Sequence, residues 1–150
     1  MTEHNNELNN LNPTGKNASG FDVLEVSSDK IVETVQSLKT DVNGQFDMLL
    51  SISGVDNKGS FDVVYHLYST IFNRNLILKV KLTGDSPSVD TISSVYSAAD
   101  WHERETYDLF GIKFNGHPNL ERILLPKDWI GHPLRKDYVQ NDKRLDWNKR

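Results

Sequence analysis

The sequence contains no cysteine among its 150 residues. This absence excludes disulfide bonds, thiolate zinc sites, a cysteine nucleophile and iron–sulfur clusters held by thiolates. There is also no apolar run close to the ~20 residues that a membrane-spanning helix needs, and the N-terminus lacks the apolar core of a signal peptide. We therefore expect an intracellular chain that contacts membranes only through partner proteins.

Clustered positive charge is also lacking, since the net charge is −4. Phosphate contacts require grouped Lys and Arg, so there is no general case for nucleic-acid binding. The charge is uneven, however, with seven basic and four acidic residues between Lys127 and Arg150. A solvated tail is the common explanation for such a segment, and contact with an acidic partner surface is the alternative.

Apolar residues are almost missing from residues 1–20, which contain six asparagines. Such a segment buries too little surface to offset its ordering entropy, so it is predicted to be a disordered tail. A short strand is expected at Phe21–Val26, and then a helix that Ser28 or Asp29 caps and that ends before Asn43. Alternating apolar residues predict three further strands at Phe46–Ile52, Phe61–Leu67 and Leu76–Leu82.

Short turns separate these strands, which favours antiparallel pairing because a parallel pair needs a crossover of a dozen or more residues. Ser86-Pro87-Ser88 is expected to begin a second helix that continues through Ala99. The prediction for residues 21–111 is an α+β domain: a three- to four-stranded, mainly antiparallel sheet with two or three helices on one face. Residues 112–150 are expected to form an extended, loop-rich, partner-binding C-terminal arm.

Residues 101–138 combine charged, histidine and aromatic side chains, which suits a polar surface that becomes buried against a partner. Asp100 and Glu103 resemble a capping box for a short helix that ends at Gly111. On that helix Arg104 and Asp108 are spaced for an ion pair. Glu103 lies within the apolar arc and Trp101 within the charged arc, so we expect both faces of the helix to be covered.

Catalytic roles for this segment have weak support. Glu103 and Glu105 are two positions apart on a helix and point in roughly opposite directions, which disfavours an acid–base pair. Imidazoles alone can bind zinc, but His102, His117 and His132 are separated by 15 residues each and match no short ligand motif. Histidine before proline is more often a turn residue.

Gly131–Asp137 reads Gly-His-Pro-Leu-Arg-Lys-Asp, in which the proline forces the preceding histidine towards extended geometry. A turn followed by a solvated basic patch is one interpretation. The other is an arm docked on another subunit, with the planar guanidinium of Arg135 as an ionic anchor and Trp129 and Tyr138 as apolar anchors.

Three blocks, Glu103–Ile112, His117–Leu124 and Gly131–Tyr138, together resemble the thirty-kilodalton subunit, also called the C subunit, of NADH-quinone oxidoreductase (respiratory complex I). One departure is Glu121, where the family often has a basic residue before the arginine matched by Arg122. The order of helix and strands from Phe21 to Leu82 is compatible with the family.

The resemblance implies a peripheral subunit on the cytoplasmic face of the bacterial plasma membrane that binds no cofactor and has no catalytic residues. The complex uses FMN, iron–sulfur clusters, NADH and quinone, and couples electron transfer to proton translocation. The implied partners are the quinone-pocket subunit (the D-type subunit) and the terminal-cluster subunit (the B-type subunit). The interface candidates are Trp101, Glu103, Arg104, Glu105, Asp108, His117, Arg122, Trp129, His132, Arg135, Lys136 and Tyr138.

Three alternatives stay open at this point. The first is the equivalent subunit of a ferredoxin-dependent complex or of a related membrane-bound hydrogenase. The second is a stand-alone hydrolase that uses Glu103 and His102. The third is an unrelated adaptor domain, which is supported only by the basic tail.

Overall fold

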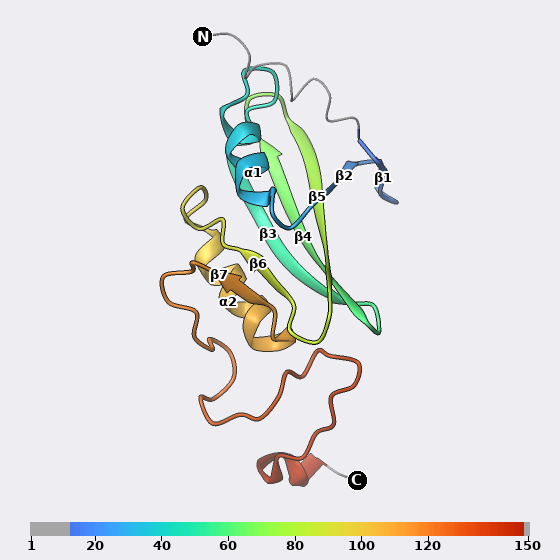
Figure 1. Ribbon diagram of the computed structural model, residues 1–150, viewed down its shortest axis with the longest axis vertical. Coiled ribbons are helices and arrows are strands. Elements are labelled where there is room, and N and C mark those ends of the chain that lie inside the picture. Colours follow the sequence, from blue (N-terminus) through green and yellow to red (C-terminus); the bar gives the residue numbers. More distant parts are fainter. Residues whose placement is uncertain (1–12, 149–150) are drawn as a thin grey trace.

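A computed structural model of the chain describes residues 13–148 (Figure 1). The elements, in chain order, are β1 (Gly15–Lys16), β2 (Asp22–Val26), α1 (Ile31–Thr40), β3 (Met48–Asp56), β4 (Ser60–Ser69), β5 (Arg74–Thr83), β6 (Ser88–Asp90), α2 (Ala99–Phe110), β7 (Lys113–Asn115) and a terminal 3-10 helix, η2 (Lys143–Asn148). Residues 13–20, which we expected to be disordered, include β1, and the rest of that predicted tail lies outside the described residues.

The larger sheet has five strands in the order β1-β2-β5-β4-β3. All of its pairs are antiparallel except β2 and β5, which run parallel with Leu24 opposite Leu78. The chain between these two strands contains α1, β3 and β4, and this provides the long crossover that a parallel pair needs. The predicted α+β class with a mainly antiparallel sheet is confirmed; the prediction missed β1 and the parallel pair.

Strand β3 contains a β-bulge that changes which side chains face the core. The register with β4 shifts between Leu49 and Ser51, because the extra residue Leu50 interrupts the two-residue alternation. Leu49 and Ile52 are buried, whereas Met48 and Leu50 are each 45% exposed. The simple alternation predicted from the sequence was therefore wrong in the first half of this strand.

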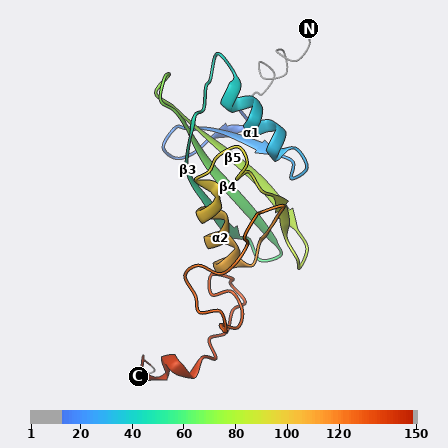
Figure 2. The same ribbon diagram turned by 90° about the vertical axis from the view of Figure 1, so that its left-hand side faces the viewer.

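Both helices cover the same face of the five-stranded sheet (Figures 1 and 2). Their buried side chains belong to one core cluster with inward-facing residues of the central strands, such as Val63 and Leu78. Helix α2 approaches β3 closely at Gly54, where an added Cβ would lie only 2.7 Å from Cδ2 of Phe110. Glycine at this position lets the last turn of α2 rest directly on the strand.

The helix predicted to begin at Ser86–Ser88 is absent from the described structure, because this segment pairs as a strand. β6 runs parallel to β7 with Val89 opposite Phe114, and both of these side chains are buried. The carbonyl of Ile92 then accepts both the Val95 and the Tyr96 N–H groups, which closes a single tight turn. Since β7 belongs to the two-stranded unit, the compact part of the chain continues past the arm boundary that we expected at residue 112.

The predicted caps of both helices were wrong. The N-cap residue of α1 is Lys30, which makes no side-chain capping bond, and the Ser27 hydroxyl instead donates to the Asp29 carboxylate. Helix α2 starts at Ala99, without a side-chain cap from Asp100. Glu103, the expected partner in that capping box, points into the core instead.

Beyond β7 the chain forms an arm that runs past the end of α2 and away from α1 (Figures 1 and 2). Every residue between 115 and 145 is at least partly exposed, although the His117 ring itself is buried. Within residues 13–148, no helix is both long and apolar enough to cross a membrane.

Candidate functional site

The arm is anchored at the C-terminal end of α2, where backbone carbonyls need external donors. Each of the last four carbonyls of the helix, those of residues 107–110, accepts a hydrogen bond. The Tyr107 carbonyl accepts from the Gly111 N–H (2.8 Å), and the Asp108 carbonyl accepts from Arg122 Nη1 (3.2 Å) and His132 Nδ1 (2.9 Å). The Leu109 carbonyl accepts from the Leu134 N–H (3.0 Å), and the Phe110 carbonyl accepts from Arg135 Nε (2.6 Å). The Gly-His-Pro-Leu-Arg segment is therefore a C-terminal cap for α2, and the positive charges of Arg135 and of Arg122 suit the negative end of the helix dipole.

The Asp108 carboxylate fixes the first half of the arm. It is fully buried, and its Oδ1 accepts a hydrogen bond from Arg122 Nη1 at 2.6 Å. Its Oδ2 accepts three consecutive backbone N–H groups, those of Ile123 (3.1 Å), Leu124 (2.8 Å) and Leu125 (2.8 Å). Burial raises the pKa of Asp108, but the hydrogen bonds from Leu125, Arg122, Leu124 and Ile123 outweigh it and the net pKa is lowered.

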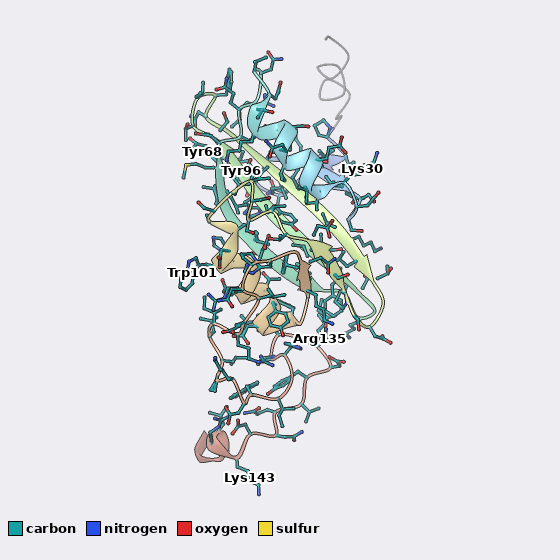
Figure 3. The ribbon with its side chains drawn as sticks, turned by 60° about the vertical axis from the view of Figure 1, so that its left-hand side comes forward. Lys30, Tyr68, Tyr96, Trp101, Arg135 and Lys143 are labelled. Carbon is teal, nitrogen blue, oxygen red and sulfur yellow. The ribbon has the colours of Figure 1, made fainter. Side chains whose placement is uncertain are left out.

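The predicted ion pair between Arg104 and Asp108 was wrong, because Asp108 pairs with Arg122. Arg104 instead donates from Nε to the Glu121 carbonyl at 3.2 Å and lies 5.4 Å from the centroid of the Trp101 ring. The arm of the same chain thus covers the Asp108 side of α2. Trp101 remains 64% exposed and projects outward in Figure 3.

Gly111 makes the cap sterically feasible. Its φ of +73° is left-handed, and a Cβ there would lie 2.5 Å from His132 Cδ2 and 2.9 Å from Arg135 Nη2. The predicted helix stop is confirmed, and the structure adds a reason for glycine beyond its backbone angle.

The His132 ring contacts the end of α2 directly. Its Nδ1 lies 2.9 Å from the Asp108 carbonyl, so Nδ1 carries the proton. Burial lowers the pKa of His132, and the nearby positive charges of Arg122 and Arg135 lower it further, against the opposing effect of the Asp108 backbone and side chain. The ring also packs edge-on against Tyr107, with 6.2 Å between centroids.

Glu103 sits in a second buried cluster, at the junction of α2 with β6 and β7. The Thr91 hydroxyl donates to Oε2 and the Ile92 N–H donates to Oε1 at 2.8 Å. His117 lies nearby, with Nε2 3.8 Å from Glu103 Oε2 and 3.2 Å from the Asp100 carbonyl oxygen. The Asn119 N–H donates to His117 Nδ1 at 3.0 Å, so Nδ1 is an acceptor and the ring is neutral with its proton on Nε2.

A neutral His117 leaves the buried Glu103 carboxylate without a cationic partner. Burial, the largest effect, raises the pKa of Glu103 to about 7, and the negative charge of Asp100 adds to it. The bonds from Thr91 and Ile92 oppose this increase. Glu103 is therefore a carboxyl group that titrates near neutral pH inside the domain.

Neither catalytic alternative finds support in this geometry. Glu103 is 0% exposed, so it cannot reach a substrate, and a hydrolytic pair with His102 has no access path. Within residues 13–148, no three His, Cys, Asp or Glu side chains are placed to hold a metal ion.

The remaining predicted residues divide between contacts within the chain and open surface. Arg135 stacks 5.0 Å from the centroid of Phe61, and the Lys136 N–H donates to Asp56 Oδ2 at 2.8 Å. Tyr138 donates from its hydroxyl to Gln140 Oε1 at 2.7 Å. Glu105 is exposed, whereas Trp129 is half-buried.

Sequence reasoning missed Asp56, which receives N–H bonds from both Lys136 and Lys58. It faces the core side of β3 with Ile52 and Gly54, so the alternation of this strand, extended four residues beyond its predicted end at Ile52, would have indicated it. Sequence reasoning also missed Thr91 and Phe61, whose partners are distant in the sequence.

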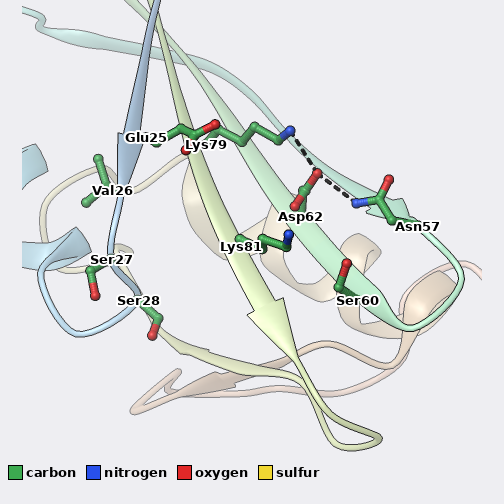
Figure 4. A pocket seen from close by; sticks show the side chains of 9 residues that line it. All are labelled: Glu25, Val26, Ser27, Ser28, Asn57, Ser60, Asp62, Lys79 and Lys81. Carbon is green, nitrogen blue, oxygen red and sulfur yellow. Dashed lines mark hydrogen bonds and ion pairs between the residues drawn. The ribbon is translucent and has the colours of Figure 1, made fainter. Parts of the chain in front are cut away.

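A separate polar cavity of about 540 Å³ lies on the opposite face of the sheet, away from both helices (Figure 4). Here Asp62 Oδ2 lies 3.0 Å from Lys79 Nζ and accepts a bond from Asn57 Nδ2 at 2.8 Å. These groups satisfy one another, and none of the predicted interface residues lies in this cavity.

Replacing Gly111 with alanine is expected to destabilise the domain by roughly 2–4 kcal/mol, because it adds backbone strain and displaces His132 and Arg135. Chemical denaturation of the purified chain measures this loss. Gly116→Ala is the matched control, since its φ is +76° but its added Cβ meets only Thr91 at 3.6 Å. We expect the control to lose about 1 kcal/mol of unfolding free energy. Equal losses in both variants would show that the contact of the added Cβ with His132 and Arg135 does not contribute.

The variant Asp108→Asn is expected to lose about 2–4 kcal/mol of unfolding free energy, because it leaves the Arg122 guanidinium without its anion. Because the pKa of Asp108 is lowered, this contribution is present above the unfolded pKa and disappears as pH falls through the folded value. Asp128→Asn, at an exposed ion pair with Arg144, should cost less than about 1 kcal/mol. Urea titrations from pH 7 down to pH 3 test both statements.

Glu103→Gln is expected to flatten the pH dependence of stability between about pH 4.5 and 7. In the wild-type chain the folded pKa of Glu103 lies above its unfolded value, so the contribution of Glu103 to stability is fully present below about pH 4.5 and is lost as pH rises through that window. The fall should be roughly 3 kcal/mol. If the unfolding free energies of the two proteins change with pH in parallel across this window, Glu103 is not the group that titrates there.

Comparison with known proteins agrees with this architecture. Residues 24–144 match the family described as respiratory-chain NADH dehydrogenase, 30 Kd subunit. The chain is 46% identical over 119 residues to the C subunit of NADH-quinone oxidoreductase from Mycolicibacterium gilvum, covering 77% of this chain and 53% of that protein. It is 46% identical over 115 residues to the C subunit from a Roseiflexus species, covering 75% and 66%. The chain thus spans about half to two thirds of the length of these relatives.

Two solved structures share the fold. One is a trypsin-resistant fragment (1–134) of Nqo5, with a TM-score of 0.63, 28% identity and coverage of 71% of this chain and 87% of that chain. The other is a chain from the membrane-bound sulfane sulfur reductase, an archaeal respiratory membrane complex, with a TM-score of 0.71, 26% identity and coverage of 85% and 76%. The sequence match over most of the chain and the shared fold lead to one conclusion: this chain belongs to the family of the 30 kDa subunit of respiratory-chain NADH dehydrogenase.

Proposed function

We propose that this chain is a structural subunit of the peripheral arm of a proton-translocating NADH-quinone oxidoreductase. In this role it binds no cofactor, and it supports electron transfer from NADH through FMN and iron–sulfur clusters to quinone by holding neighbouring subunits in place. Its partners are the subunit that forms the quinone pocket and the subunit that carries the terminal cluster. It attaches to the cytoplasmic face of the membrane through these partners.

The observation that carries this proposal is the C-terminal arm. Its path is fixed at the end of α2 by Asp108 and by the Gly131–Arg135 cap, yet it exposes large apolar side chains instead of burying them. Leu124 is 60%, Ile130 88%, Leu134 51% and Val139 69% exposed. A defined backbone with uncovered apolar side chains is typical of a surface that a partner protein covers.

A second candidate is the equivalent subunit of another respiratory membrane complex, such as a ferredoxin-dependent complex or a membrane-bound hydrogenase. The similarity to a chain of the sulfane sulfur reductase complex favours this class. The two candidates use the same scaffold role and differ in the electron donor of the whole complex.

Purification of the tagged chain from solubilised membranes distinguishes them. We expect it to be recovered with quinone-pocket and cluster-bearing subunits and with a flavin-binding, NADH-oxidising subunit. Recovery with a nickel-binding hydrogenase subunit would identify the second candidate, and recovery of the chain alone would contradict both.

The variant Trp101→Ser is expected to lower the yield of purified complex more than it lowers the stability of the isolated chain. Trp101 is largely exposed, so its loss should change the unfolding free energy of the isolated chain by less than about 1 kcal/mol. Its removal from a partner contact should reduce the yield of assembled complex several-fold. Val42→Ser, at an apolar side chain that is 72% exposed on the loop after α1, is the control and should leave the yield unchanged. Equal losses in stability and in assembly would contradict an interface role for Trp101.

A further inference from the structure

Strand β3 lies at the margin of the five-stranded sheet, with β4 on one side and no strand on the other within residues 13–148 (Figure 1). It is nine residues long and has no proline and no charged side chain before Asp56. The other edges are short, since β1 has two residues and β6 and β7 have three each. Natural proteins usually shorten a sheet edge or place lysine or proline on it, because a free edge pairs with other strands. Apart from the bulge at Leu50, β3 has none of these protections.

The hairpin between β3 and β4 shows which backbone groups of β3 are free. The Asn57 N–H donates to the Ser60 carbonyl at 2.9 Å, so these two residues form a hydrogen-bonded pair. Hydrogen-bonded and non-hydrogen-bonded pairs alternate along an antiparallel ladder, so every second residue of β3 turns its N–H and C=O groups away from β4. These outward residues are Ile52, Gly54 and Asp56. The intervening residues, which bond to β4, are Ser51, Ser53 and Val55.

The free edge is accessible from outside the chain. Gly54 has no side chain, so its partial exposure is exposure of its backbone. No backbone group outside the sheet, within the part of the chain that the structure describes, bonds to the N–H or the carbonyl of an outward residue. The edge is therefore a row of donors and acceptors without protein partners.

The spacing of these groups determines what can pair with them. Free N–H and C=O groups recur at every second residue, about 7 Å apart along the strand. An α-helix uses its backbone groups internally, whereas an extended strand presents free groups at this same spacing. Val55, between two outward residues, is 40% exposed and offers an apolar side chain to the same strand. An extended segment is therefore the occupant that fits this edge.

The edge also continues the surface that we propose to face a partner. Helix α2, which carries the exposed Trp101, packs directly on β3. The arm reaches the end of the same strand, where the Lys136 N–H donates to Asp56 Oδ2 at 2.8 Å. A partner that covers the arm and the outer side of α2 is thus positioned beside the free edge.

We propose that an extended segment of a partner subunit pairs with residues 52–56 of β3 and adds a sixth strand to the sheet. The bulge at Leu50 ends the regular ladder, so the pairing starts at Ile52. The main chain of the partner supplies acceptors and donors to the three outward residues. This inference rests on the proposed function, because it needs a partner subunit.

Hydrogen exchange at single β3 amides tests the pairing in the free full-length chain and in the purified complex. In the free chain, the outward amides should exchange quickly and the intervening amides slowly, because only the intervening amides are bonded to β4. In the complex, a paired strand should slow exchange of the outward amides about tenfold or more and change the intervening amides little. Mass spectrometry with fragmentation to single residues measures both sets.

The variant Ser53→Lys tests the same edge through assembly. Ser53 is exposed, so the urea unfolding midpoint of the free chain should stay unchanged. A lysine on an edge strand opposes pairing with a further strand, so the yield of assembled complex should fall several-fold. Ser19→Lys makes the same chemical change at an exposed serine between β1 and β2, beyond the opposite side of the sheet, and should leave the yield unchanged.

Three exchange results would overturn the inference. Unchanged exchange of the outward amides in the complex would show that the edge stays free. Equal slowing of the outward and intervening amides would show that a partner covers β3 without pairing. Protection in the free chain that increases with its concentration would show that a second copy of this chain occupies the edge. These results leave the proposed function intact, whereas a wild-type chain that purifies without partners would contradict the proposed function and the pairing together.

Discussion

The arrangement of the whole C-terminal third depends on one interaction, the buried Asp108 carboxylate with its four donors. A charge at the inner side of α2 is stable only because Arg122 and three consecutive backbone N–H groups surround it. The same donors belong to the arm, so satisfying the carboxylate also fixes where the arm runs. Arg122 then reaches the Gly131 carbonyl from Nη2 at 2.9 Å, which leads the chain into the helix cap.

This arrangement explains why the polar segment looked like an active site or an interface when read as sequence. Many of its charged and histidine residues have partners in the same chain: Asp108 with Arg122, His132 with the end of α2, and Arg135 with the Phe110 carbonyl. Intramolecular anchoring gives the arm a rigid path without a core of its own. Its exposed apolar side chains are then left for the partners that we propose, and rigidity before binding reduces the entropy lost on assembly.

Much of the fold was predictable because local patterns determine it. The β4 and β5 alternation, α1 and the Gly111 stop follow from periodicity and backbone preference. The failures come from long-range contacts. The bulge at Leu50 shifts the phase of β3, Ser88–Asp90 becomes a strand because β7 offers pairing groups, and Glu103 turns inward because Thr91 and Ile92 supply donors. The site residues were identified from their chemistry, but which of them contact each other could not be read from spacing.

The parallel pairing of β2 with β5 has a consequence for synthesis of the protein on the ribosome. Asp22 pairs opposite Leu76, so about fifty further residues must leave the ribosome before β2 can pair with β5. Until then α1 has only β3 and β4 to cover, and β2 has a free edge. Contacts this distant in sequence slow folding and prolong the exposure of an unpaired strand. The nascent chain therefore exposes an unpaired edge of β2 until β5 leaves the ribosome, well before the arm is made.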